Sequence, residues 1–270
     1  MTAAVLQDAR PRLRVGAEQA WALTTRATLA TARNPANWLP GLIFPLVMAA
    51  VYAAQFADAT ALPDFPEVDS FLQFILPSAI LQGIAFNSAN AGSDMATDIE
   101  TGFFDRLISS PVARQSILIG RVGGAAASAG FQSLVLMGIF LLFGAPVKSG
   151  VAGAVALVII SVLLAVALAG FGLMVALRTG SPEATQAMFP LIFVAVFVSS
   201  AFFPTALMKG WYQQVAEVNP ITLIVNPTRE LVITGWSWAD FGQAVGLTVL
   251  VAIVSLSLSY RAYLSRLADA

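Results

Sequence analysis

The sequence contains no cysteine and no histidine, and its only two lysines are Lys148 and Lys209. Without cysteine the chain forms no disulfide, and without either residue type it offers no Cys/His metal site. Ser-His-Asp and Cys-His catalytic arrangements are excluded for the same reason. We therefore expect no catalytic residues, no metal and no cofactor in this chain.

Charge is also scarce. Charged residues make up 11% of the chain, against roughly 25% in soluble domains. Apolar residues make up 58%, more than a soluble fold of 270 residues is able to bury, so the chain is predicted to be an integral membrane protein. A net charge of -1 gives no basic field for nucleic acid. Asp8, Arg10, Arg12, Arg14 and Glu18 make the first residues polar, and we expect no secretory signal there.

Long uncharged runs alternate with short charged segments. The runs cover 34–57, 70–93, 122–147, 149–177, 184–208 and 241–260. Each reaches about 20 residues, the length with which a helix crosses the hydrocarbon core. The sequence therefore predicts an all-α polytopic membrane protein of one domain, residues 1–270. Its six transmembrane helices are expected near 38–56, 71–91, 117–143, 151–177, 184–203 and 241–260.

The basic residues predict the orientation. With both termini in the cytoplasm, the outside receives only Lys148, Lys209 and Arg229. The inside receives Arg10, Arg12, Arg14, Arg26, Arg33, Arg106, Arg114, Arg121, Arg178, Arg261 and Arg266. This excess favours cytoplasmic termini and a cytoplasmic segment between the second and third spans.

That segment, residues 93–121, is the most charged part of the chain. It carries Asp94, Asp98, Glu100, Asp105, Arg106, Arg114 and Arg121. Met95, Ile99, Phe103 and Leu107 recur every fourth residue, which predicts a short helix with one apolar side. Such a helix suits a soluble partner that pushes on a membrane domain. A solvated loop that only joins two spans is the alternative.

Two further segments resemble neither spans nor free loops. In 15–33, Trp21, Leu23 and Leu29 lie among polar residues, which predicts an amphipathic helix in the membrane interface or, alternatively, a soluble helix. In 204–238, apolar residues are interrupted by Asn219-Pro220 and Asn226-Pro227. We expect one or two short re-entrant helices there at the outer leaflet, with an aromatic surface loop as the alternative.

Small residues mark two other features. Ser181 is expected to cap a helix that starts at Pro182, after a tight turn over 178–183. Gly120 and Gly124 form a GxxxG pair, a pattern of close helix packing that a Gly/Ala-rich chain also produces by chance.

The chain has neither an ATP-binding loop nor the buried charges of an ion-coupled carrier. A P-loop needs Gly-Lys-Ser/Thr, and neither Lys148 nor Lys209 follows a glycine. The predicted spans carry essentially no charge, whereas ion-coupled carriers usually bury a charged group there. These absences indicate a membrane subunit that a separate ATPase drives.

The charged segment resembles the central motif of type-2 ABC-transporter permeases of the daunorubicin-resistance kind. The matching positions are Glu100, Gly102, Leu107, Pro111, Gly120 and Arg121, whereas Thr97-Asp98-Ile99 replaces the usual basic residues. A second match is Asn219-Pro-Ile-Thr, followed by Arg229. Six spans and broken outer helices fit the same family, so the resemblance covers almost the whole chain.

The resemblance implies the permease subunit of an ATP-driven exporter of hydrophobic or amphipathic compounds, such as drugs, antibiotics or lipids, in a bacterial cell membrane. Two ABC ATPase subunits, with ATP and Mg on those chains, and a second permease copy or homologue would be its partners, besides membrane lipids. Segment 93–116 would be the main coupling helix and 178–183 a second contact. The implied coupling residues are Asp98, Glu100, Gly102, Phe103, Asp105, Arg106, Leu107, Ser181 and Glu183.

Substrate is expected to pass along spans two and five, as in that family. Phe189, Phe193 and Phe197 form a stripe on one face of span five, which suits a flat amphipathic ligand or, alternatively, helix and lipid packing. Gln82 and Asn87 on span two offer polar contacts. Two other functions stay open: export of a lipid-linked polysaccharide, and a membrane enzyme that acts on lipid through Asp94, Asp98, Glu100 and Asp105.

Overall fold

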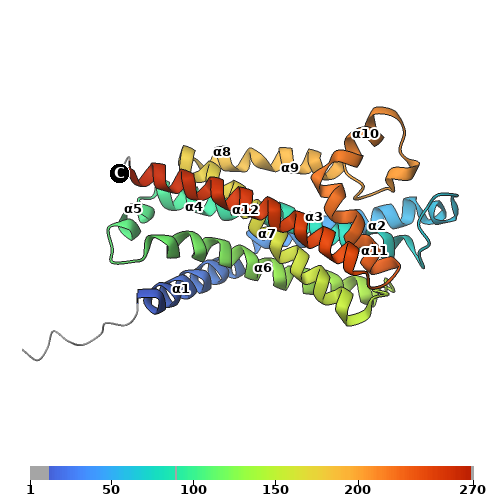
Figure 1. The fold of residues 1–270 in the computed structure, drawn as a ribbon, viewed down its shortest axis with the longest axis horizontal. Helices are drawn as coiled ribbons and strands as arrows, with labels where there is room; N and C mark the ends of the chain where they lie inside the picture. Colours follow the sequence, from blue (N-terminus) through green and yellow to red (C-terminus); the bar gives the residue numbers. More distant parts are fainter. Residues whose placement is uncertain (1–11, 89, 269–270) are drawn as a thin grey trace, which may run out of the picture.

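A computed structural model describes residues 12–88 and 90–268 of the chain, and the regular elements in this part are all helices (Figure 1). The larger α-helices are α1 (Arg12–Arg33), α2 (Pro35–Gln55), α3 (Phe71–Ser88), α4 (Asn90–Glu100), α6 (Arg114–Leu142), α7 (Gly150–Thr179), α11 (Pro220–Ile233) and α12 (Trp238–Ala268). The shorter ones are α5 (Phe103–Ile108), α8 (Pro182–Gln186), α9 (Met188–Phe197) and α10 (Gly210–Val218), with 3-10 turns η1 (Ala57–Ala61) and η2 (Thr205–Leu207). An all-α membrane fold is confirmed. Of the residues that make the start of the chain polar, Asp8 and Arg10 lie within 1–11, outside the described residues.

Five stretches of the described chain are long and apolar enough to cross a membrane. They are Pro35–Gln55, Phe71–Glu100, Arg114–Leu142, Gly150–Thr179 and Trp238–Ala268. The fifth predicted span, 184–203, is divided between α8 and α9, and Pro182–Phe197 falls below that length. Sixteen helical residues extend about 24 Å, short of a hydrocarbon core of about 30 Å. Six spans therefore remain a prediction.

Helix α3 lies at the centre of the bundle. Most of its residues are buried, and its apolar side chains, among them Phe74 and Ile80, pack with α2, α6 and α7. Helix α7 packs along α12 through the close approach of Gly170 to Ser255. Since α3 continues toward α4, the buried centre is connected directly to the charged segment (Figure 1).

The three glycines at the start of α6 pack against α1. A Cβ added at Gly120, Gly123 or Gly124 would meet Leu23, Thr24 or Ala27, respectively. Two helices approach this closely only where one of them lacks side chains at the crossing. The GxxxG pair therefore serves packing within the chain, and it holds the amphipathic helix α1 along α6.

The single helix predicted from the spacing of Met95, Ile99, Phe103 and Leu107 is divided into two helices, α4 and α5, so that prediction is wrong. Gly102 has φ +69°, a left-handed conformation that ends α4 and turns the chain into α5. The turn changes the apolar face, so that Phe104 is fully buried while Phe103 is half-buried. Met95 and Ile99 are buried as the four-residue spacing predicts.

The stretch 204–238 forms two short helices, α10 and α11, near the end of the molecule that also carries η1 (Figure 1). Asn219 accepts a hydrogen bond from Ile221 N–H, 2.9 Å away, and caps α11, while Pro220 occupies its first turn. The second pair, Asn226-Pro227, lies inside α11 and does not interrupt it. The predicted break at Pro227 is thus wrong, although the short helices themselves are present.

Candidate functional site

The candidate site lies at one end of the molecule, where α1, α4, α5, α8 and the C-terminal end of α12 come together (Figure 1). Helices α4 and α5 form a hairpin that turns at Gly102. Its inner side packs Met95, Ile99 and Phe104 against Leu173 and Tyr263 of the neighbouring spans. The hairpin is thus attached to the membrane bundle on one side and open on the other.

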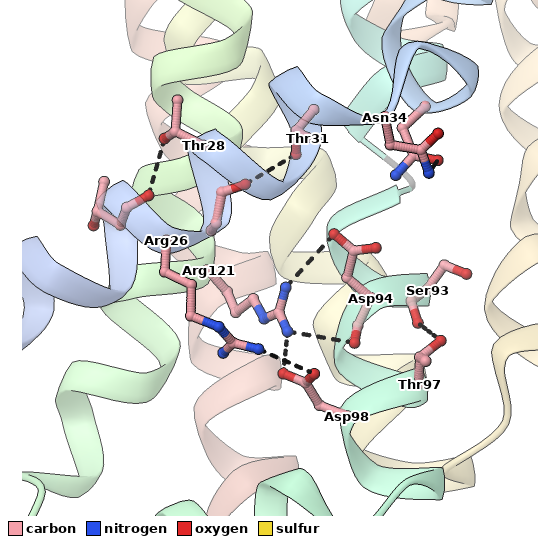
Figure 2. A network of polar contacts seen from close by, with 12 residues as sticks. Arg26, Thr28, Thr31, Asn34, Ser93, Asp94, Thr97, Asp98 and Arg121 are labelled. Carbon is pink, nitrogen blue, oxygen red and sulfur yellow. Dashed lines mark hydrogen bonds and ion pairs between the residues drawn. The ribbon is translucent and has the colours of Figure 1, made fainter.

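A network of charged side chains joins helix α4 of the hairpin to α1 and α6 (Figure 2). Arg121 of α6 donates a hydrogen bond to a carboxylate oxygen of Asp98 on α4 and forms an ion pair of 3.5 Å with Asp94. Arg26 of α1 lies 3.9 Å from the other carboxylate oxygen of Asp98. Two arginines therefore balance two aspartates, and each helix contributes a charge.

Burial makes the pair between Arg121 and Asp98 the strongest contact of this network. Their side chains are only 12% and 16% exposed. Charges shielded from water interact more strongly, and the loss of one partner is costly. Asp98, predicted to contact the ATPase, is held toward α1 and α6 and connects α4 to both helices.

The open side of the hairpin carries the other predicted coupling residues. Glu100, Asp105 and Arg106 are exposed, and Leu107 is half-buried. Phe103 is covered by Arg26, whose guanidinium carbon lies 4.1 Å from the ring centroid, and α1 thereby contacts the hairpin again. Arg26 was not predicted as a site residue, because its contacts depend on the approach of α1.

Helix α1 is also attached to the chain that follows the hairpin. Gln19 accepts a hydrogen bond from Ala113 N–H at 2.8 Å and donates one to Pro111 C=O at 3.3 Å. Ser116 Oγ donates to Gly16 C=O at 2.9 Å. These contacts fix α1 to the start of α6, so that the two helices form one unit.

The second predicted contact, the turn over 178–183, lies beside the first. Ser181 accepts a hydrogen bond from Ala184 N–H at 3.2 Å, which confirms the predicted helix cap. Its hydroxyl donates to Glu183 at 2.6 Å, and this bond lowers the pKa of the Glu183 carboxyl. Gln186 of α8 reaches Ser93 of α4 at 3.5 Å, so the two predicted contacts are neighbours.

A buried arginine lies at the other end of the molecule. Arg229, one of the three basic residues assigned to the outer side of the membrane, is 3% exposed. Its guanidinium donates to three backbone carbonyl oxygens, those of Phe74 at 3.1 Å, Ser200 at 2.7 Å and Ala201 at 3.2 Å. It also donates to two side chains, to Ser78 Oγ at 2.8 Å and to Asn226 Oδ1 at 3.2 Å. It also lies 3.9 Å from the centre of the Phe74 ring. These bonds tie α11 to α3 and to the chain after α9.

The predicted pathway residues do not line one surface. Asn87 donates to Gln132 at 2.6 Å and to Trp38 C=O at 3.4 Å, within a polar network between α2, α3 and α6. Phe189 and Phe193 pack against Phe86, with centroid distances of 4.9 and 6.0 Å. Phe197 stacks on Phe193 at 4.3 Å.

Gln82 lines a groove of about 530 Å³ between α3, α7, α9, α11 and α12. The residues of α9 that line the groove are Leu191, Ile192, Ala195 and Val196. The predicted stripe of Phe189, Phe193 and Phe197 does not line it. Gln82 is 2% exposed, and neither atom of its amide has a hydrogen-bond partner in the structure. An unsatisfied amide in an apolar wall is costly, because it has lost its water without a replacement.

Comparison with known proteins identifies the family. The model of the ABC-2 type transporter family matches residues 18–233, which include α3, the hairpin and α11. A daunorubicin resistance ABC transporter permease protein of Streptomyces coeruleorubidus is 24% identical, over 82% of this chain and 76% of its own length. A putative transport permease of Pyropia yezoensis is 27% identical, over 88% of this chain and 86% of its own length. A probable doxorubicin resistance ABC transporter permease protein of Mycobacterium tuberculosis is 25% identical, over 72% and 71%. Since the family model covers most of the chain, this protein belongs to the ABC-2 type transporter family.

Proposed function

We propose that the chain is the permease subunit of an ATP-driven exporter of hydrophobic or amphipathic compounds. The observation that carries the proposal is the hairpin of α4 and α5, which is exposed at Glu100 and Asp105 and attached to α1 and α6 through Asp98 and Arg121. The sequence has no P-loop, so ATP and Mg bind to a separate ABC ATPase. The membrane is a bacterial cell membrane, with both termini and the hairpin in the cytoplasm.

The hairpin converts movement of the ATPase into movement of the spans. Closure of the ATPase pushes on the exposed side at Glu100 and Arg106. The inner side transmits this movement to α6 through Arg121 and to α12 through the contact of Phe104 with Tyr263, 6.1 Å between ring centroids. Rigid-body rocking of packed helices is a common form of such a transition.

Two copies of the permease assemble with two ATPase subunits. The described chain has apolar faces that one copy leaves exposed, including Leu191 at 70% and Phe131 at 64%. A membrane or a second permease is able to cover such faces.

The groove beside Gln82 supports an apolar substrate. Its walls are apolar except for Ser78, Gln82 and Asn219, and its volume of about 530 Å³ lies in the range of small-molecule pockets. A compound with an apolar body and one hydrogen-bonding group fits such walls better than a sugar chain does. The groove thus favours drugs, antibiotics or lipids over a lipid-linked polysaccharide. The lipid-enzyme alternative has no such support, since no three His, Cys, Asp or Glu side chains in the described ranges form a group able to hold a metal ion.

The test is co-purification and transport. The tagged permease is expected to co-purify from its native membrane with a P-loop ATPase, and proteoliposomes holding both are expected to export an amphipathic dye when ATP is supplied. An ATPase variant without its catalytic carboxylate is the matched control and should bind without transport. Recovery of the permease with no ATPase, together with dye export that needs no ATP, would contradict the proposal.

A further inference from the structure

A basic cavity lies between the C-terminal ends of α7 and α12. Its volume is about 420 Å³, and three arginines line it: Arg178 of α7 and Arg261 and Arg266 of α12. The remaining lining residues are Phe104, Asp105, Leu177, Ala262 and Ser265. The cavity thus brings three positive charges and one carboxylate to one place, next to the α4–α5 hairpin.

The three arginines are poorly neutralised. Across residues 12–88 and 90–268, the structure shows neither a hydrogen bond nor an ion pair for the side chains of Arg178 and Arg261. Arg266 donates one N–H to Leu177 C=O at 3.0 Å. This bond uses a free carbonyl at the end of α7 and fixes the Arg266 guanidinium at the cavity wall, with other N–H groups left to donate.

The cavity lies at the level where lipid headgroups are expected. The uncharged run of α7 ends at Leu177, and that of α12 ends at Tyr260. Both helices are apolar enough to span a membrane, and on each the next residue is an arginine. The change from apolar to charged residues on two adjacent spans marks the edge of the hydrocarbon core, where phosphates of the lipids lie.

We propose that this cavity binds the headgroup of an anionic phospholipid. Guanidinium groups match the oxygens of a phosphodiester through paired N–H donors, and basic pockets between spans attract anionic lipids. Asp105 accepts a hydrogen bond from a hydroxyl of the headgroup, which favours phosphatidylglycerol over phosphatidic acid. Because the cavity contacts α5, a bound lipid connects the hairpin to α7 and α12.

Titration of the purified full-length chain with defined lipids, read by native mass spectrometry, tests this site. Dioleoyl phosphatidylglycerol is expected to bind about ten-fold more tightly than dioleoyl phosphatidylcholine. The double variant Arg178→Gln/Arg261→Gln should lose this preference and keep the Tm, because neither side chain makes a bond within the described structure. The control Arg33→Gln/Lys209→Gln removes the same charge from exposed positions elsewhere and should keep the preference.

Four results would overturn the proposal. One is equal affinity of the unmodified chain for the two lipids. Another is an equal loss of the lipid preference in the control variant, which would mean that the net charge of the chain, and not the cavity, determines the preference. The third is displacement of the lipid by free glycerol 3-phosphate at similar concentration, which would assign the site to a soluble phosphate. The fourth is a double variant that keeps the lipid preference but no longer co-purifies with its ATPase, which would make the cavity part of a protein interface.

Discussion

Arg121 of α6 donates a hydrogen bond from Nη2 to Oδ2 of Asp98 on α4, and both side chains are largely shielded from water. Asp98 thereby connects the hairpin to the third predicted span, while Arg26 connects it to α1 (Figure 2). Because α1 is itself packed on the glycines of α6, the hairpin, α1 and α6 form one packed unit. The ion pair thus joins helices that are far apart in the chain and is shielded from water.

Asp98→Asn is expected to separate the hairpin from α6. The substitution keeps the shape of the side chain but leaves the Arg121 guanidinium without its closest charge, at a cost of about 2 kcal/mol in unfolding free energy, the range of a hydrogen bond to a charged group. We expect a lower Tm in detergent and a loss of ATP-driven transport while ATP hydrolysis continues. Asp94→Asn is the matched control, since Asp94 is 35% exposed at 3.5 Å from Arg121 and should show the smaller effect. An equal effect of the two substitutions would contradict the special role of Asp98.

Glu100→Arg is expected to weaken the ATPase complex without a change in stability. Glu100 is exposed and accepts no side-chain hydrogen bond within the described residues. Reversal of its charge should lower the affinity for the ATPase about ten-fold or more if it pairs with a basic group there. Binding of the purified ATPase to permease nanodiscs measures this effect. Glu67→Arg, also exposed but in the loop after η1, is the control and should bind normally. Normal binding by both variants would remove Glu100 from the interface.

The sequence predicted those features that depend on local spacing and failed where distant segments meet. Uncharged runs predicted the long helices, and Ser181 predicted the start of α8, because both signals lie within a few residues. The charge bias assigned Arg229 only to a side of the membrane, whereas the structure surrounds it with five acceptors from α3, α11 and the chain after α9. An arginine within an apolar stretch was a signal of burial, but its acceptors are mostly backbone carbonyls that have no sequence pattern.

The hairpin shows the same limit at closer range. The four-residue spacing correctly predicted that Met95 and Ile99 are buried. The left-handed turn at Gly102 then rotates the chain, so that Phe104 is fully buried in place of Phe103. The role of Arg26 depends on how α1 packs against α6, which in turn depends on Gly120 and Gly124. Each of these facts requires two segments far apart in the chain to be placed together first.

Arg229→Ala is expected to destabilise the protein severely. It removes the donor for five oxygens at the junction of α3 and α11, and it leaves several of them unpaired in an apolar interior, which costs about 3 kcal/mol or more. A large fall in Tm in detergent is therefore expected. Lys209→Ala is the control, since Lys209 is exposed and outside α10, and it should change the Tm little. A Tm for Arg229→Ala close to that of the control would refute the structural role of this arginine.

Gly124→Ala and Gly138→Ala are expected to have opposite effects on stability. Both lie within α6, where alanine favours a helix by about 1 kcal/mol. A Cβ at Gly124 would lie 2.6 Å from Ala27 Cβ, so α1 would have to move away, whereas a Cβ at Gly138 would meet no atom of the described residues within 4 Å. We expect Gly124→Ala to lower the Tm and to increase proteolysis of α1, and Gly138→Ala to raise the Tm slightly. A rise in both would mean that α1 does not depend on the close crossing.

Gln82→Leu is expected to raise stability and to reduce transport. The amide of Gln82 is buried without a hydrogen-bond partner in the structure, so leucine removes a cost of about 1–3 kcal/mol and adds apolar contact. If the amide binds the polar group of a substrate in the groove, the same substitution raises the KM for that substrate while ATPase binding stays normal.

Gln132→Leu is the matched control for this substitution. Gln132 Nε2 donates to Gly41 C=O at 2.8 Å, and its oxygen accepts from Asn87 at 2.6 Å, so its replacement leaves two polar groups unpaired and should lower the Tm. Thermal unfolding of both variants, together with dye export as a function of dye concentration, separates the two effects. A Gln82→Leu variant that is more stable and exports with unchanged KM would show that the groove packs against lipid and does not bind the transported compound.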